Sequence, residues 1–250
     1  LVTSLLASEA NKRGKKVGIL DADVTGPSIP KTFGITNPLT ADNDGILPAQ
    51  TQSGIKVMSV NLMLPKGDIP VAWRGPVVSG AIRQFWSETN WGDIDYMFVD
   101  MPPGTGDIQL TLSQQVPLTG AVVVTTPQDI ALIDAKKGLR MFQKVNVPIL
   151  GIIENMSVFI CPHCGEVEHI FGEGGAKRMS EQYGVPLLGE LPLSAKIREQ
   201  ADSGLPTVAA EPDGKEALMY REMAMKVAGA LARITKDYTA KMPGIRVVND

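Results

Sequence analysis

Cysteine and long apolar runs are scarce in this sequence, and each scarcity argues against a class of protein. Only Cys161 and Cys164 occur among its 250 residues, which excludes a disulfide-rich secreted scaffold and favours a reducing, cytoplasmic setting. No apolar run approaches the length of a membrane span and the first residues show no secretory signal pattern, so we expect no membrane partner. A formal net charge of −3, without Lys/Arg-rich runs, argues against general nucleic-acid binding.

The dominant pattern is an alternation of apolar runs with amphipathic segments. We expect strands at residues 17–20, 56–62, 96–100, 120–125, 148–153 and 185–191, and we expect those at 17–20, 96–100 and 120–125 to be buried. We expect helices at residues 2–13, 76–89, 108–115, 129–145, 174–183 and 215–234. This alternation predicts one α/β domain, residues 1–235, with a doubly wound, mostly parallel sheet, followed by a tail at 236–250. In the helix at 129–145 the apolar positions include Ile130, Ile133, Leu139 and Phe142.

A stretch from Tyr96 to Asp107 joins one of these strands to a loop rich in proline and glycine. The strand ends at Asp100, and residues such as Pro102 and Gly104 prevent a helix or strand from continuing. In an open parallel sheet, ligands bind outside the carboxyl ends of the strands. A carboxylate there, followed by a loop able to approach a phosphate closely, suits a magnesium–nucleotide site. A capping Asp in an ordinary turn is the alternative.

Two further carboxylates, Asp21 and Asp23, follow the strand at residues 17–20. Alternate residues of an extended segment point the same way, so both side chains can face one site. One can hold a magnesium-bound water while the other orients an attacking water. The alternative is a helix N-cap before Pro27.

Asn155 is another polar residue at the carboxyl end of a predicted strand. Its amide both donates and accepts hydrogen bonds, and so can read the edge of an adenine or guanine base. A turn-forming Asn is the alternative interpretation.

The Cys161-Pro162-His163-Cys164-Gly165 segment interrupts the α/β pattern. Glycine after the second cysteine allows the turn that directs two sulfurs to one metal. Two thiolates are only half of a tetrahedral zinc site or an iron–sulfur cluster. Either His163 and His169 complete a zinc site within one chain, or two chains each contribute a pair across a two-fold axis.

Five segments together resemble the Mrp/ApbC family of P-loop ATPases, which are iron–sulfur cluster carriers related to MinD, ParA and the nitrogenase iron protein. The resemblance covers nearly the whole chain. Its segments are GILDADVTGPS at 18–28, WRGP at 73–76, DMPPGTGD at 100–107, ENMS at 154–157 and CPHC at 161–164.

This resemblance implies a P-loop NTPase fold, slow ATP hydrolysis with Mg²⁺, and roles for the residues above. Asp21 and Asp23 would belong to the first switch, which positions the hydrolytic water and the magnesium shell. Asp100 would lie near Mg²⁺, with residues 102–107 as the second switch. Asn155 and the Leu191-Pro192 turn would contact the adenine.

The resemblance also implies partners. Cys161 and Cys164 would hold half of a [4Fe–4S] cluster bridging a homodimer, which passes the cluster to recipient apoproteins. A ParA/MinD-like positioning ATPase and a zinc-stabilised nucleotide-binding protein are the alternative functions. The segment 236–250 contains Pro243 and no apolar stripe, unlike the membrane helix that ends MinD-type chains.

One family motif does not occur in the sequence. The glycine-rich phosphate loop of the form GKGGVGK[ST] would immediately precede the first helix, and the sequence given begins at Leu1. Such a loop cradles phosphates with its backbone N–H groups. We therefore expect that an N-terminal segment is omitted, and that ATPase activity depends on it.

Overall fold

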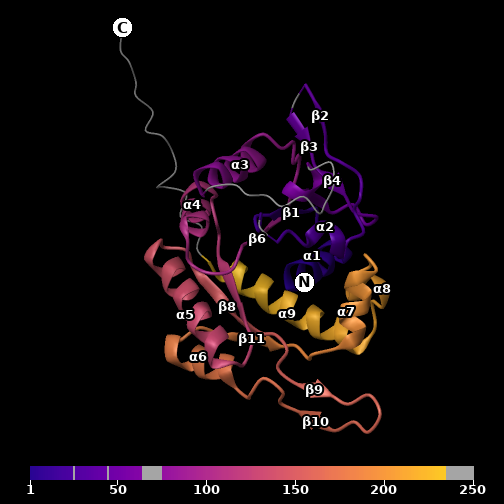
Figure 1. Ribbon diagram of the computed structural model, residues 1–250, viewed down its shortest axis with the longest axis vertical. Helices are drawn as coiled ribbons and strands as arrows, with labels where there is room; N and C mark the ends of the chain where they lie inside the picture. The colour runs from indigo at the N-terminus through magenta and orange to yellow at the C-terminus, as the bar shows by residue number, and fades with distance from the viewer. Residues whose placement is uncertain (25, 44, 64–74, 235–250) are drawn as a thin grey trace.

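The computed structural model describes residues 1–24, 26–43, 45–63 and 75–234, and shows helices packed around parallel strands (Figure 1). Trp73 and Arg74 of the WRGP segment and the predicted tail at 236–250 lie outside these residues. The strands are β1 Val17–Asp21, β2 Thr40–Asp42, β3 Gly45–Leu47, β4 Ala49–Gln50, β5 Lys56–Ser59, β6 Tyr96–Asp100, β7 Ala121–Thr125, β8 Ile149–Glu154, β9 Phe159–Ile160, β10 Val167–Glu168 and β11 Leu187–Glu190.

The helices agree closely with the apolar periodicity of the sequence. They are α1 Val2–Lys12, α2 Ile29–Thr32, α3 Gly75–Ser87, α4 Asp107–Gln115, α5 Asp129–Lys144, α6 Gly175–Tyr183, α7 Ala195–Asp202, α8 Thr207–Ala210 and α9 Lys215–Arg233, with a 3₁₀ turn at Val60–Leu62. Ser194 caps α7, its hydroxyl accepting a hydrogen bond from the backbone N–H of Ile197 at 3.4 Å. Among the described residues, none of these helices has the length and apolar character to span a bilayer.

The main strands form two hydrogen-bonded sheets, with orders β4-β5-β1-β6 and β11-β8-β7. All pairings in them are parallel except that of β4 with β5. The α/β class with mostly parallel strands is confirmed. One continuous sheet was expected, but within the described residues β6 and β7 are not hydrogen-bonded to each other.

Helices cover both faces of the two sheets, which explains why the strands read as continuous apolar runs. On the first sheet, α1 and α2 cover one face and α3 and α4 the other. On the second, α9 and α1 cover one face and α5 and α6 the other. Successive residues of β1 serve opposite faces: Ile19 packs toward α1 and Leu20 toward α3.

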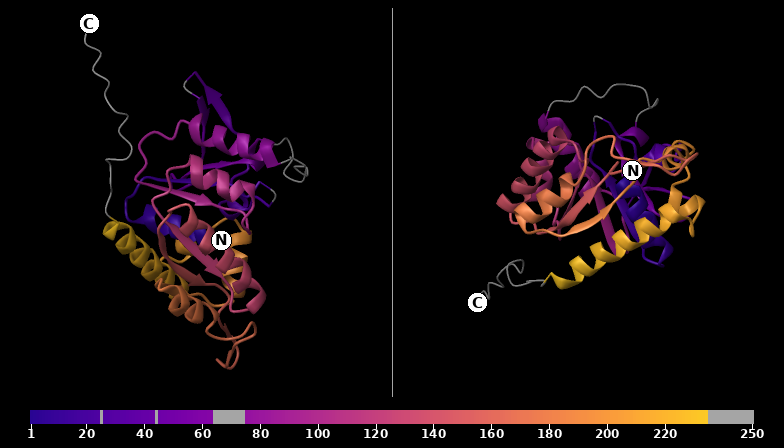
Figure 2. Two further views of the ribbon diagram at one scale, coloured as in Figure 1. Left: turned by 90° about the vertical axis from the view of Figure 1, so that its left-hand side faces the viewer. Right: turned by 90° about the horizontal axis from the view of Figure 1, so that it is seen from below.

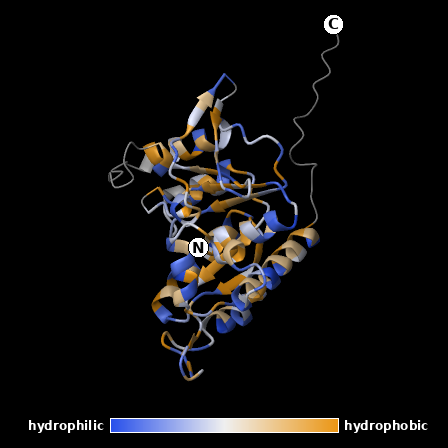
Figure 3. Ribbon diagram, turned by 90° about the vertical axis from the view of Figure 1, so that its right-hand side faces the viewer, coloured by the Kyte–Doolittle hydropathy of each residue, from blue (hydrophilic) through white to orange (hydrophobic). Residues whose placement is uncertain are grey.

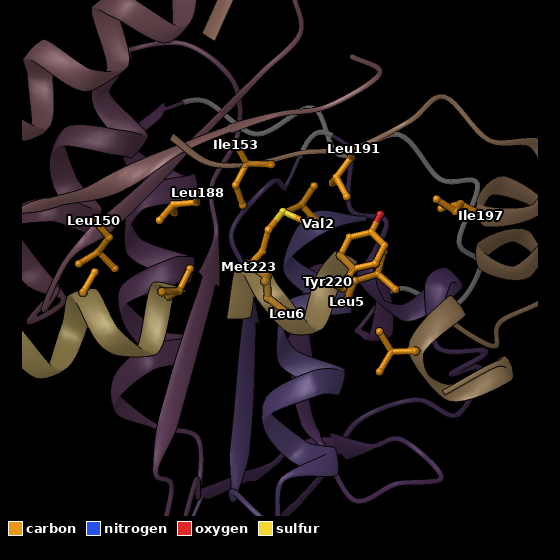
Figure 4. Packing of buried hydrophobic residues seen from close by; sticks show 13 residues of the cluster. Val2, Leu5, Leu6, Leu150, Ile153, Leu188, Leu191, Ile197, Tyr220 and Met223 are labelled. Atoms are coloured by element: carbon orange, nitrogen blue, oxygen red, sulfur yellow. The ribbon is translucent and has the colours of Figure 1, made fainter. Parts of the chain in front are cut away.

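One core cluster joins α1, α9 and the second sheet (Figure 4). Leu5 and Leu6 of α1 pack there with Tyr220 and Met223 of α9 and with Leu188 of β11. Burial of such side chains stabilises the fold by roughly 1.5–3 kcal/mol each. Helix α1 therefore contributes to the cores of both sheets.

Two apolar positions predicted for α5 are not buried. Ile130 is 77% exposed and Ile133 is 53% exposed, whereas Leu132 and Leu139 are buried against β7, β8 and α6. Of the four apolar positions named from the sequence, Leu139 is therefore buried as expected, whereas Ile130 and Ile133 lie on the exposed side of α5.

Candidate functional site

Asp21 and Asp100 occupy the carboxyl ends of neighbouring parallel strands, and the register of β1 and β6 places them directly opposite each other. Asp21 is buried at 1% exposure and Asp100 is partly buried. Thr3 of α1 donates its hydroxyl hydrogen to Asp100 Oδ1. The predicted convergence of these two carboxylates at one sheet edge is therefore present.

The surroundings of Asp21 oppose its ionisation. Burial, followed by the negative charge of Asp100, raises its pKa from 3.8 to about 7, although hydrogen bonds favour the charged form. Its Oδ2 accepts from Ser59 Oγ at 3.0 Å and from the Ile29 N–H at 3.4 Å. Its buried Oδ1 has no hydrogen-bond partner among the described residues. An unpartnered carboxylate oxygen beside a second carboxylate is the donor set that Mg²⁺ takes.

Asp23 lies two residues beyond Asp21 and is partly exposed. Its Oδ1 accepts a hydrogen bond from the Gly26 N–H at 3.1 Å, so the side chain closes a local turn. The Asp23 backbone N–H is also one of the groups that favour the charged form of the Asp21 carboxylate and so lower its pKa. The two residues thus share one turn at the end of β1.

The loop after Asp100 is held by a residue that the sequence did not single out. Gln109 of α4, 5% exposed, donates through Nε2 to the Pro102 carbonyl at 3.2 Å and the Pro103 carbonyl at 2.8 Å. Gly104 has φ of +94°, a conformation in which glycine is strongly favoured. From the sequence, Gln109 was recognisable only as a polar residue in the first turn of a predicted helix.

Asn155 and the Leu191-Pro192 turn lie together at the ends of β8 and β11. The Leu191 N–H donates to the Glu154 carbonyl at 2.8 Å, and the Ser157 N–H donates to the Leu191 carbonyl at 2.8 Å. Asn155 Oδ1 accepts from the N–H of Met156, whose φ is +54°. Three predicted site residues are therefore brought together by the parallel pairing of β8 with β11.

This second group does not share a sheet with Asp21 and Asp100, contrary to our expectation. β8 belongs to the three-stranded sheet, whereas β1 and β6 belong to the four-stranded one. The two sheets are separate because their nearest strands in sequence, β6 and β7, are not hydrogen-bonded to each other in the described part of the chain. The predicted site therefore consists of two edges, one of carboxylates and one formed by Asn155 with the Leu191 turn.

Cys161 and Cys164 lie in the loop of the hairpin formed by β9 and β10, which we call the cysteine hairpin and which projects from the body (Figures 1 and 2). Cys164 is exposed and Cys161 partly so. The Gly165 N–H donates to the Cys161 carbonyl at 2.9 Å and Gly165 has φ of +76°, which is the turn predicted from the sequence. N–H groups of Cys164 and His163 directed at the Cys161 sulfur lower the pKa of its thiol.

The histidines near the cysteines do not complete a site within one chain. Across residues 1–24, 26–43, 45–63 and 75–234, no group of three or more His, Cys, Asp or Glu side chains is placed to hold a metal ion. His163 and His169 are both exposed. The zinc site predicted as an alternative for a single chain is therefore not assembled by these residues.

The arrangement of helices, parallel strands and acidic strand ends is that of a P-loop NTPase of the MinD and ParA type. Residues 1–228 match the family described as ParA, NUBPL iron-transfer P-loop NTPase. The chain belongs to this family of iron-transfer P-loop NTPases.

Curated relatives are identical to this chain at about half of the positions in the matched regions. An iron–sulfur cluster carrier protein of Pseudomonas fragi is 52% identical over 88% of the chain and 77% of its own length. The carrier protein of Escherichia coli K12 is 52% identical over 90% of the chain and 61% of its own length. The chain thus spans between about three fifths and four fifths of these relatives.

Solved structures agree with the fold. A nucleotide-binding protein from Archaeoglobus fulgidus in complex with ADP superposes with a TM-score of 0.73 at 38% identity, over 87% of this chain and 84% of that one. The cell division ATPase MinD of Pyrococcus furiosus gives a TM-score of 0.67 at 21% identity, over 91% and 92% of the two chains, which concerns the fold alone.

Proposed function

We propose that this protein is a cytoplasmic, ATP-binding and ATP-hydrolysing carrier of iron–sulfur clusters. The observation that carries the proposal is the exposed Cys161–Cys164 pair on a projecting hairpin, in a chain of the iron-transfer family. Two thiolates are half of the four ligands that a [4Fe–4S] cluster takes. We infer that a second copy supplies the other half across a two-fold axis, and that the homodimer passes the cluster to recipient apoproteins.

Apolar side chains around the cysteines support a homodimer at this position. Ile160, Val167 and Ile170 are each 53% exposed, and apolar residues are visible on the cysteine hairpin in Figure 3. A second copy placed hairpin to hairpin would cover these side chains while bringing its thiolates to the same cluster. Burial of apolar surface and metal ligation would then favour the same assembly.

The two edges of the site would contact different parts of MgATP. Asp21 and Asp100 would hold the magnesium shell, and Asp23 would orient the attacking water. When bound, Mg²⁺ supplies positive charge that offsets the charge developing on the phosphates. Pro102 and Gly104 belong to the loop that would approach the phosphates, and that loop is held by the Gln109 amide.

The second edge would hold the base. Asn155 and Pro192, both half-buried, lie at the adjoining ends of β8 and β11, where an amide and an apolar ring suit an adenine. The Leu191 side chain packs in the core instead, so it would shape this turn from beneath. The A. fulgidus relative is in complex with ADP, which supports nucleotide binding by this chain. A phosphate loop is needed as well, and the given sequence contains none.

Anaerobic reconstitution with iron and sulfide tests the carrier function. Iron, sulfide and zinc are measured on the species separated by size, together with the visible absorption. A shared [4Fe–4S] cluster requires about four iron per dimer and none on the monomer, whereas a closed zinc site requires about one zinc per chain.

Matched variants identify the ligands. Replacing both Cys161 and Cys164 by Ser should abolish iron uptake and the dimer together, whereas replacing His163 and His169 by Ala should leave both unchanged. A monomer that holds one zinc, lost in the His variant and without iron uptake, would favour a zinc-stabilised protein. Nucleotide-dependent assembly without metal would favour a positioning ATPase.

A further inference from the structure

Glu154 ends β8 with a fully buried carboxylate, 0% exposed, to which the site described above assigns no role. Its Oε1 accepts a hydrogen bond from the Ser157 hydroxyl at 2.7 Å. Its Oε2 accepts from the backbone N–H of Ala176 at 2.6 Å. Residues 158–174, which we call the cysteine segment, lie between these two donors and contain the cysteine hairpin. One carboxylate therefore holds both ends of that segment.

The burial of Glu154 is costly unless its hydrogen bonds are strong. An unpaired carboxylate in a protein interior is strongly destabilising, and charge-assisted hydrogen bonds are the interactions that offset this. Ala176 is the second residue of α6, whose N-cap is Gly174 and so carries no side-chain acceptor. Glu154 supplies the acceptor and the negative charge that the start of a helix favours.

Other contacts fix the same two ends of the segment. Before it, the Ser157 N–H donates to the Leu191 carbonyl. After it, a Cβ on Gly175 would lie 2.6 Å from the Pro127 carbonyl oxygen, so α6 begins in direct contact with the loop before α5. The start of the cysteine segment is thus attached to the Leu191 turn of the proposed base-binding edge, and its end to the loop between β7 and α5.

We propose that Glu154 is a positioning residue that sets the cysteine pair relative to the base-binding edge. It adjoins Asn155 in the chain, so a change in the backbone at Asn155 reaches both anchors of the cysteine segment through one side chain. This inference rests on the proposed function for the identity of the cargo, but the anchoring itself does not depend on a bound cluster.

The variant Glu154→Gln tests the anchoring with minimal change in shape. The glutamine oxygen can accept one hydrogen bond, but its NH₂ group cannot accept the other, so one anchor is lost. We expect hydrogen–deuterium exchange of the amides at 158–174 to accelerate roughly tenfold or more in the metal-free protein. We also expect faster loss of the reconstituted cluster to an iron chelator. Glu181→Gln, the same change on the exposed side of α6, should match the parent in both measurements.

Ser157→Ala keeps the test decisive if the Gln variant fails to fold. It removes only the Oε1 anchor, so exchange should accelerate at the start of the segment while the first turn of α6 stays protected. Exchange at 158–174 equal to the parent in both variants would overturn the proposal, as would equal acceleration throughout β8 and α6. If the parent takes up no iron, the carrier function fails, while the exchange data still decide the role of Glu154.

Discussion

Asp21 and Asp100 lie opposite each other in the register of β1 and β6, and the charge of Asp100 is one cause of the raised pKa of Asp21. Two carboxylates this close cannot both ionise without an unfavourable interaction. A divalent cation removes that conflict, which is why such a pair suits a magnesium shell.

Stability should therefore fall as pH rises when no metal is present. The pKa of Asp21 is raised from 3.8 to about 7, so between these values the folded protein keeps a proton that the unfolded chain has released. The free energy of unfolding then decreases with pH across this window, by about 4 kcal/mol at most. Asp21→Asn should remove this dependence and be more stable than the parent at pH 8. Urea unfolding from pH 4 to pH 8 in EDTA measures it.

The control for this measurement is Asp23→Asn, which removes a partly exposed carboxylate from the same turn. The decline seen in the parent should persist in it. A parent protein whose stability is flat between pH 4 and pH 7 would contradict the electrostatic account.

ATP hydrolysis should depend on both carboxylates of the first turn. In a protein that includes a phosphate loop, Asp21→Asn and Asp23→Asn should each lower kcat by about two orders of magnitude or more while largely sparing ATP affinity. The two carboxylates are proposed to position the attacking water and the metal in the transition state, and not to bind ATP in the ground state. Asp129→Asn, at the exposed start of α5, is the control. If both variants hydrolysed ATP at the parent rate, neither Asp21 nor Asp23 would have the proposed role in hydrolysis.

Gln109 should determine the order of the loop after Asp100. Gln109→Leu leaves the Pro102 and Pro103 carbonyls without the Nε2 donor, and we expect about 1–2 kcal/mol less stability. Hydrogen exchange of the amides at 104–106 should accelerate, as mass spectrometry can show. Gln114→Leu, on the exposed side of the same helix, should change neither quantity. Unchanged exchange in the Gln109 variant would show that the loop is ordered by other contacts.

The apolar residues of the cysteine hairpin should be required for the dimer. Ile160 and Val167 are opposite each other in the pairing of β9 with β10, so glutamate at both positions would place like charges in the proposed interface. The cluster-dependent dimer should be lost in sedimentation velocity, while the fold is retained. Ile133→Glu on α5 is matched in exposure at 53% and should leave the dimer intact. If the hairpin variant kept the dimer and Ile133→Glu lost it, the interface would lie on α5.

The fold could be predicted because its strands are buried on both faces. Runs such as 17–20 and 148–153, which become the buried strands β1 and β8, need no further information to be recognised as strands of an α/β protein. The apolar face of α5 was harder to predict. Ile130 lies two residues, about 200°, from Leu132 around the helix, and which of the two faces the sheet depends on packing rather than on periodicity.

The same distinction holds for the site. Asp21, Asp100 and Asn155 could be recognised because each is a polar residue at the end of an apolar run; Asp21 and Asp100 end their strands and Asn155 follows β8. Thr3 and Glu154 could not, because their roles arise from contacts made after folding: Thr3 meets Asp100 97 positions away, and Glu154 meets Ala176 22 positions away. Sequence therefore indicated candidate residues at strand ends, but not the contacts that hold them in place.

The hairpin that presents the cysteines is joined by only two residues on each side, Phe159–Ile160 and Val167–Glu168. A ladder this short has little stability of its own in water. Ligation at its tip would therefore also be a local folding step, in which the cargo serves as the core that the hairpin lacks. The affinity for metal and the order of the hairpin would then be thermodynamically linked. A change that destabilises the base of the hairpin would also weaken the binding of the cargo.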